Sequence, residues 1–109
     1  MTLSTHVLDM MHGRPAAGMA LSLWQDQVKL FDGVTDGDGR CPGLRELTLE
    51  KGRYRLVFKV ADYFRMQGAA LQDPPFLDAV PIDFGIADEG HYHVPLLASP
   101  FAYSTYRGS

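Results

Sequence analysis

Apolar and polar side chains alternate with a period of two in several short stretches of the chain, a pattern typical of β-strands with one buried face. The clearest examples are residues 53–60 and 79–86. Proline cannot donate a hydrogen bond to a neighbouring strand, so Pro81 places the second stretch at a sheet edge or a bulge. The remaining strands are expected at 3–9, 19–25, 27–34, 44–48, 91–97 and 101–107.

One short segment predicts a helix. Asp62 can cap its N-terminus, residues 63–67 can form about a turn and a half, and Gly68 can end it. Many short strands separated by turn residues favour an all-β fold. We therefore expect one domain over 1–109, an antiparallel β-sandwich or barrel with one short helix.

Three of the expected strands have an unusual second face. Their first faces should form part of the core: Leu3, Thr5 and Val7; Tyr92, Val94 and Leu96; Phe101, Tyr103 and Thr105. The opposite faces carry a mixture of residues that includes no Lys, Asp or Glu: Ser4, His6, Leu8, His91, His93, Pro95, Leu97, Ala102, Ser104 and Tyr106. A solvated sheet face normally carries charges, and an apolar patch usually marks a contact site. If the three strands are neighbours, we expect another subunit to cover this face and to enclose a polar pocket there.

Composition narrows the possible functions of the domain. The 109 residues include 10 basic and 13 acidic side chains, a formal charge of −3, which argues against nucleic-acid binding. A single cysteine, Cys41, can form neither an internal disulfide nor a zinc cage of thiolates. No apolar run reaches the length of a membrane helix, about 18 residues, and residues 1–6 do not resemble a secretory signal. These features predict a cytoplasmic protein.

The histidines are the main candidates for chemistry. Imidazole titrates near neutral pH, so a pair of histidines offers an acid and a base. His91 and His93 should lie ~7 Å apart on one strand face, and with His6 they could instead bind zinc. Taken singly, each could also be a half-exposed strand residue. Arg40 ends a turn rich in Gly and Asp, where it could hold an anionic or carbonyl-rich ligand or simply be solvated.

Five segments of the chain together resemble a known family. They are STHVLD at 4–9, GRPA at 13–16, TDGDGRC at 35–41, HYHVPLL at 91–97 and YRGS at 106–109. In this order the chain resembles the transthyretin-related family of 5-hydroxyisourate hydrolases. The combination of HYHVPLL with YRGS is the most specific part. The hormone carrier transthyretin lacks these histidines and the YRGS segment.

The resemblance implies a two-sheet sandwich that assembles as a homotetramer, with its sites at the interface between dimers. It implies hydrolysis of 5-hydroxyisourate to 2-oxo-4-hydroxy-4-carboxy-5-ureidoimidazoline in urate degradation, with no cofactor and no metal. The family's catalytic residues correspond to His6, Arg40, His93 and Ser109. Its substrate-binding positions correspond to His91, Ser104, Tyr106, Arg107 and Gly108.

This leads to a mechanistic hypothesis. His6 or His93 takes a proton from water as the water attacks the ring carbonyl, and Arg40 stabilises the charge that develops on the carbonyl oxygen. Ser109 positions water or substrate through its hydroxyl or through a terminal carboxylate. Two alternatives remain open: a transthyretin-like carrier of small aromatic ligands, and a zinc hydrolase that uses His6, His91 and His93.

Overall fold

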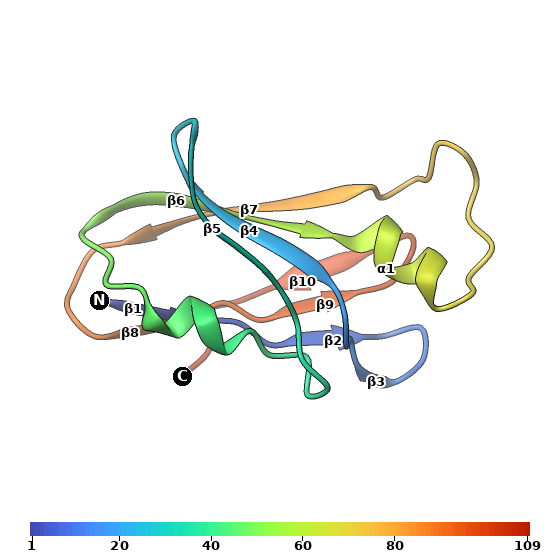
Figure 1. Cartoon of the computed structure of the whole chain (residues 1–109), viewed down its shortest axis with the longest axis horizontal. Helices are drawn as coiled ribbons and strands as arrows, with labels where there is room; N and C mark the ends of the chain where they lie inside the picture. Colours follow the sequence, from blue (N-terminus) through green and yellow to red (C-terminus); the bar gives the residue numbers. More distant parts are fainter.

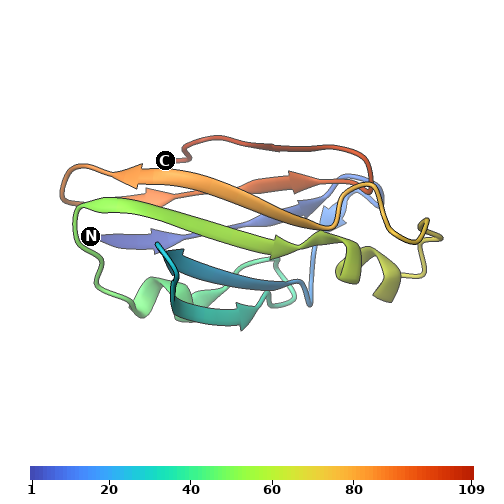
Figure 2. The same ribbon diagram turned by 90° about the horizontal axis from the view of Figure 1, so that it is seen from above.

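The computed structural model describes residues 1–109 and consists of two layers of β-strands that pack face to face (Figure 1). A single α-helix lies at one end of the layers. Seen from above, the strands of both layers run along the long axis of the molecule (Figure 2). The expected β-sandwich with one short α-helix is confirmed.

The first layer is a four-stranded sheet in the order β5-β4-β6-β7. Its strands are β4 (Ala20–Gln25), β5 (Val28–Val34), β6 (Gly52–Lys59) and β7 (Ala79–Ile86). All three of its strand pairs are antiparallel. As predicted from Pro81, β7 lies at an edge of the sheet.

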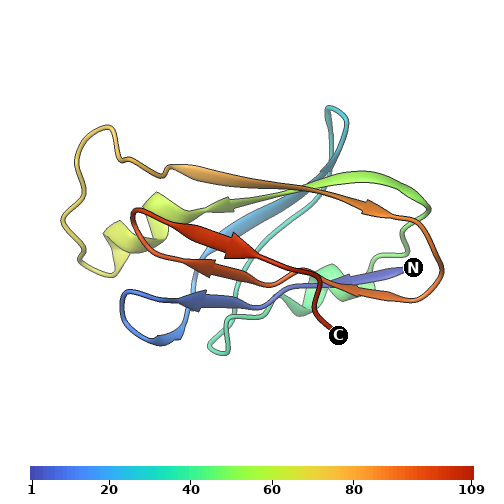
Figure 3. The ribbon, with the colours of Figure 1, turned by 180° about the vertical axis from the view of Figure 1, so that it is seen from behind.

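The second layer contains the segments with the histidines. Its strands are β1 (Thr2–Ser4), β2 (Val7–Asp9), β3 (Arg14–Pro15), β8 (His91–His93), β9 (Leu96–Ala98) and β10 (Tyr103–Thr105). Strands β10, β9, β2 and β3 form one sheet, and β1 pairs with β8 (Figure 3). The three segments with the unusual second face are therefore neighbours. Two pairs, β1–β8 and β2–β9, are parallel, a difference from the expected antiparallel arrangement that side-chain alternation cannot reveal.

The core lies between the two layers and follows the predicted alternation in most strands. In the segments that form β1, β2, β8 and β9, the six predicted core residues are all buried: Leu3, Thr5, Val7, Tyr92, Val94 and Leu96. The opposite layer contributes Leu23, Leu56 and Phe58, which are completely buried. This two-sided burial holds the histidine segments on a rigid base.

Two of the predicted elements differ from the structure. Residues 44–48 are not a strand: Pro42–Glu46 form a 3-10 helix, η1, with a proline in its first turn and Leu44 buried. The short apolar pattern there suits either element. Helix α1 (Val60–Met66) starts earlier than predicted, so Asp62 lies in its first turn and is not the cap. Gly68 follows the helix with a φ of 86°, a left-handed conformation typical of a residue that ends a helix.

The predicted core residues of the last strand are exposed. Phe101 is 69% exposed and Tyr103 is 43% exposed, and Thr105 is also exposed. Strand β10 pairs only with β9 at the edge of its sheet, so the opposite layer does not cover its side chains. Pro95, predicted for the open face, is buried instead, because it lies in the irregular link between β8 and β9.

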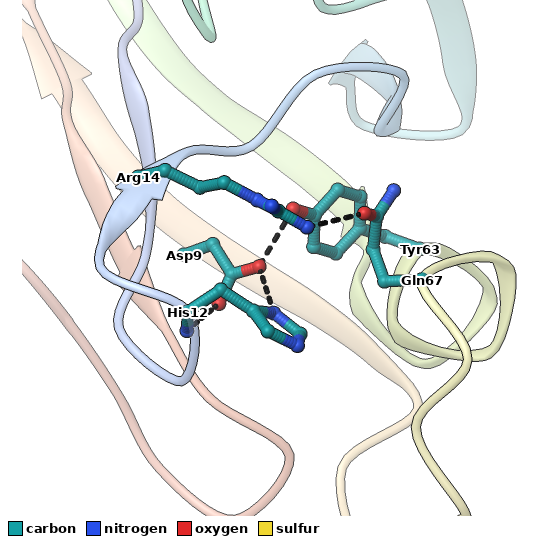
Figure 4. Close-up of polar contacts among 5 residues, drawn as sticks. All are labelled: Asp9, His12, Arg14, Tyr63 and Gln67. Atoms are coloured by element: carbon teal, nitrogen blue, oxygen red, sulfur yellow. Dashed lines mark hydrogen bonds and ion pairs between the residues drawn. The ribbon is translucent and has the colours of Figure 1, made fainter.

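A buried carboxylate ties β2 to helix α1 (Figure 4). The hydroxyl of Tyr63 donates a hydrogen bond to Asp9 over 2.7 Å, and His12 donates its backbone amide and approaches through its ring Nδ1 over 2.7 Å. Burial by itself raises the pKa of Asp9, but the hydrogen bonds from Tyr63 and His12 outweigh it and lower the pKa overall. Burial and the bond to Asp9 raise the pKa of Tyr63 to about 12. The cluster fixes the end of β2, three residues after His6.

No helix in the structure is long and apolar enough to cross a membrane.

Candidate active site

Parallel pairing brings the histidine segments side by side. Strand β1 lies against β8 with Thr2 opposite His91 and Ser4 opposite His93. Backbone hydrogen bonds continue past the strand ends, from the Val94 amide to the Ser4 carbonyl (2.9 Å) and from the Leu96 amide to the His6 carbonyl (3.0 Å). The result is a continuous backbone ladder that places His91 and His93 next to the segment with His6.

Two hydroxyl groups contact the rings of His91 and His93, and one of them, that of Ser4, connects the two rings. The hydroxyl of Thr2 lies 2.7 Å from Nδ1 of His91. The hydroxyl of Ser4 lies 2.7 Å from Nε2 of His91 and 2.7 Å from Nδ1 of His93. Thr2, His91, Ser4 and His93 therefore form one line of hydrogen bonds, in which His93 has only Nε2 left for other partners.

The loop that carries Arg40 is held against the segment with His6. His6 and Arg40 form a β-bridge, and the amide of Val7 donates to the Gly39 carbonyl over 2.8 Å. A carboxylate oxygen of Asp36 accepts the amide of Arg40 (3.0 Å). Gly39 has a φ of 76°, and a Cβ there would lie 2.5 Å from the Val7 carbonyl oxygen, so this close approach requires glycine.

The C-terminal residues lie beside His93 and contact one edge of its ring. The amide of Gly108 donates to the His93 carbonyl over 2.8 Å, and the two residues form a β-bridge. A Cβ added to Gly108 would overlap the Cδ2 edge of the His93 imidazole. Gly108 thus contacts one edge of the ring, while Ser4 contacts Nδ1 on the other.

Electrostatics keep these imidazoles neutral. Burial lowers the pKa of His93 most, and the nearby basic side chains of Arg40, His6, His91 and Arg45 lower it further. Burial also lowers the pKa of His91, with a contribution from Arg45. A neutral imidazole at physiological pH can accept a proton, which is the state that a general base needs.

Contacts and charge interactions connect five of the predicted site residues: His6, Arg40, His91, His93 and Gly108. The others lie on the exposed tail and edge strand: Ser104, Tyr106, Arg107 and Ser109. The Arg107 guanidinium lies 4.2 Å from the centre of the Tyr92 ring, a cation–π contact.

Sequence reasoning assigned no role to three residues that contact or influence these rings. Thr2 and Ser4 bond to the histidines, and Arg45 in η1 acts on the pKa of His91 and His93. The sequence did indicate that Ser4 lies near His6, because the two residues share one face of the predicted strand 3–9. Nothing in the sequence placed Arg45 near the histidines, since η1 was expected to be a strand.

The face that carries the histidines is open in the single chain. A surface hollow of about 840 Å³ lies elsewhere, along β6 and β7, and its lining includes Arg53, Arg55 and Asp83 but no histidine. No group of three or more His, Cys, Asp or Glu side chains converges as a metal site does. Leu8 and Leu97, on the same open face, are partly exposed.

Together, the two-layer sandwich and the cluster of His6, Arg40 and His93 define a transthyretin-like β-sandwich with acid–base groups in one layer. The model of the HIUase/Transthyretin family matches residues 3–108. The chain belongs to this family.

Similar proteins cover almost the whole chain. A 5-hydroxyisourate hydrolase of Mesorhizobium japonicum is 50% identical over 98% of this chain and 91% of its own length. The structure of 5-hydroxyisourate hydrolase from Klebsiella pneumoniae is 38% identical over 100% of both chains, with a TM-score of 0.88. The structure of an (S)-allantoin synthase is 39% identical with a TM-score of 0.91. It covers 99% of this chain, which spans only 43% of that longer protein.

Proposed function

We propose that this protein hydrolyses 5-hydroxyisourate to 2-oxo-4-hydroxy-4-carboxy-5-ureidoimidazoline, a step of urate degradation. The observation that carries the proposal is the convergence of His6, Arg40 and His93 from three distant parts of the chain. The Mesorhizobium and Klebsiella relatives are 5-hydroxyisourate hydrolases, which supports the proposal.

The chemistry follows from the groups present. His6 or His93 takes a proton from water, and the water oxygen bonds to the ring carbonyl carbon of the substrate. The Arg40 guanidinium stabilises the negative charge on the carbonyl oxygen. The C–N bond then breaks, and the ring nitrogen receives the proton from the imidazole. Ser109 positions water or substrate, and His91 lies beside the pocket.

The working form is a homotetramer with its sites at the interface between dimers. Two observations support this assembly: the histidine face is open in one chain, and Leu8 and Leu97 lie on it with no Lys, Asp or Glu on the same face of their strands. Covering the face with a second copy would exclude water and strengthen every charge interaction within it. Ser104, Tyr106 and Arg107 then line the channel between subunits.

The reaction requires no metal and no cofactor in this proposal. His6 or His93 activates the water and Arg40 stabilises the developing charge, the two tasks that a zinc ion would otherwise perform. The cell compartment is the cytoplasm, and the single free thiol of Cys41, buried in the core, fits reducing conditions.

A spectroscopic assay tests the function directly. Urate oxidase generates 5-hydroxyisourate from urate in the cuvette, and the purified protein should accelerate the decay of its absorbance. Spontaneous decay at an unchanged rate would contradict the proposal. The same assay with excess chelator should show full activity, whereas a loss that added zinc restores would favour the zinc hydrolase. Thyroxine binding without accelerated decay would favour the carrier.

A further inference from the structure

We propose that Ser4 is a positioning residue whose hydroxyl sets the tautomer of His93 and shares its proton with His91. The inference rests on the proposed hydrolase function and deepens it, because it assigns the general base to His93. It starts from one contact, the Ser4 hydroxyl held 2.7 Å from a ring nitrogen of each histidine.

Hydrogen counting restricts this contact. The Ser4 hydroxyl has one proton, so it can donate to one histidine and must accept from the other. The Thr2 hydroxyl continues the line at Nδ1 of His91. The protons of His91 and His93 are thus coupled, and when both rings are neutral the line has two possible directions.

One direction prepares His93 as a base. His93 donates its Nδ1–H to Ser4, Ser4 donates its hydroxyl proton to Nε2 of His91, and His91 donates its Nδ1–H to Thr2. This leaves the lone pair of His93 on Nε2, which makes no hydrogen bond within the chain. Nε2 is then the one ring nitrogen of His93 that can take a proton from water. His6 has no comparable hydroxyl partner in the chain.

Gly108 keeps the ring in this orientation. Its backbone lies close to the Cδ2 edge of the His93 imidazole and limits displacement of the ring, while the hydrogen bond to Ser4 favours the orientation with Nδ1 on that side. If the ring turned over, Nδ1 would lose its hydroxyl partner. Ser4 and Gly108 thus hold opposite edges of the ring, and together they decide which nitrogen serves the reaction.

The line also provides a place for the transferred proton. When Nε2 of His93 takes a proton from water, the Nδ1 proton can move to Ser4 as the Ser4 hydroxyl proton moves to Nε2 of His91. The positive charge then lies on His91. The shifts reverse as Nε2 of His93 gives its proton to the departing ring nitrogen, so the water molecule supplies one OH to carbon and one H to nitrogen.

The charged surroundings make such sharing useful. Arg40, His6, His91 and Arg45 all act on His93, and Arg45 also acts on His91. A full positive charge fixed on His93 would face the Arg40 guanidinium in the same site. Arg40 acts on the pKa of His93, whereas the charge that acts on His91 is that of Arg45. A positive charge on His91 is therefore repelled less by Arg40 than one on His93, while repulsion from Arg45 limits how far the equilibrium shifts toward His91.

The test replaces Ser4 in the full chain. Ser4→Ala removes the bridge and should lower kcat roughly 10- to 100-fold with little change in KM, the size of effect seen when a group that orients a ligand or base is lost. Ser4→Thr restores a hydroxyl on a β-branched residue suited to a strand, and should recover most of the activity. Ser22→Ala, the same change on the opposite sheet, is the matched control and should leave kcat unchanged.

Two further measurements separate positioning from simple damage. ¹⁵N NMR of the histidines should find the proton of neutral His93 on Nδ1 in the wild type and a mixture of tautomers in Ser4→Ala. In the same variant the acidic limb of the pH–kcat profile should move, because His93 no longer shares a proton with His91. A proton on Nε2 of neutral His93 in the wild type, or full kcat in Ser4→Ala, would overturn the inference. An inactive wild type would instead contradict the hydrolase function itself, while the NMR result would still decide the role of Ser4.

Discussion

Gly108 lies so close to the ring of His93 that a single added methyl group would overlap it. Gly108→Ala should therefore displace either the ring or the tail, and we expect a loss of at least about 10-fold in kcat, since small misplacements of catalytic groups are costly. Gly85→Ala is a suitable control, because a Cβ at Gly85 has open space around it. Equal kinetics for the two variants would show that the contact does not position His93.

The pH dependence should follow the lowered pKa of His93. Burial first, and then the nearby positive charges, shift this pKa below 6.5, so the ring stays neutral to lower pH. The acidic limb of kcat/KM should lie below pH 6.5. The unfolded chain binds a proton at His93 more readily than the folded protein does, because the pKa is lower in the folded state. The contribution of neutral His93 to the free energy of unfolding is therefore present above pH 6.5 and is lost as the pH falls.

Arg45 offers a way to move this limb. Arg45→Gln removes one of the charges that lower the pKa of both His91 and His93, so the limb should move up toward 6.5. Arg53→Gln, on the outer face of the opposite sheet, should not move it. The measurement is a profile of kcat/KM against pH for the wild type, Arg45→Gln and Arg53→Gln. An acidic limb that does not move in Arg45→Gln would show that the Arg45 charge does not set the pKa of the catalytic histidine.

The roles of His6, Arg40 and His93 can be separated by kinetics. His93→Ala should lower kcat by about 10²- to 10⁴-fold, the usual contribution of a general base. Arg40→Lys keeps the charge but loses the planar fork of donors, so we also expect a clear fall in kcat. His6→Ala should retain more activity than His93→Ala if His93 is the base. Unchanged kcat in all three variants would contradict the assignment.

The buried Asp9 should be important for stability. Tyr63→Phe removes the hydroxyl that donates to a completely buried carboxylate and should lower the free energy of unfolding by about 1–3 kcal/mol. Tyr54→Phe removes only a bond to the Glu50 carbonyl and should cost less, about 0.5–1.5 kcal/mol. Urea denaturation at pH 7 measures both.

The pH dependence of this cluster has a defined sign. Because hydrogen bonds lower the pKa of Asp9 below 3.8 in the folded state, its contribution is present above 3.8 and is lost as the pH falls further. The contribution of Tyr63 is present below pH 10 and is lost as the pH rises toward about 12. A Tyr63→Phe protein as stable as the wild type would show that the hydrogen bond from Tyr63 to Asp9 does not contribute to the free energy of unfolding.

The open histidine face should be a contact between copies of the chain. Leu97→Glu places a charge on β9 opposite Ser104, which should dissociate a tetramer into smaller species and reduce activity. Val28→Glu, on a strand of the other layer where Val28 is 61% exposed, is the control. Light scattering after size exclusion gives the mass of each. A wild-type monomer with full activity would contradict the proposed assembly.

Period-two alternation predicted most of the strands and the buried sides of those that carry the histidines. The alternation predicted burial wrongly for side chains whose exposure depends on whether another segment covers their strand. Phe101 and Tyr103 alternate like core residues, yet β10 is an edge strand that the opposite layer does not cover. Residues 44–48 contain only two apolar side chains, Leu44 and Leu47, which are too few to distinguish a strand from a 3-10 helix.

The sequence by itself determined the β-sandwich and the face on which His6, His91 and His93 lie, because alternation along a strand is a local property of the chain. Only the tertiary structure decided that β1 and β8 run parallel, and this pairing brings Ser4 between the two rings. Strand direction, ring contacts such as that of Gly108, and the charge of Arg45 beside the histidines all depend on segments far apart in the chain. Such pairings arise from packing, which no local pattern encodes.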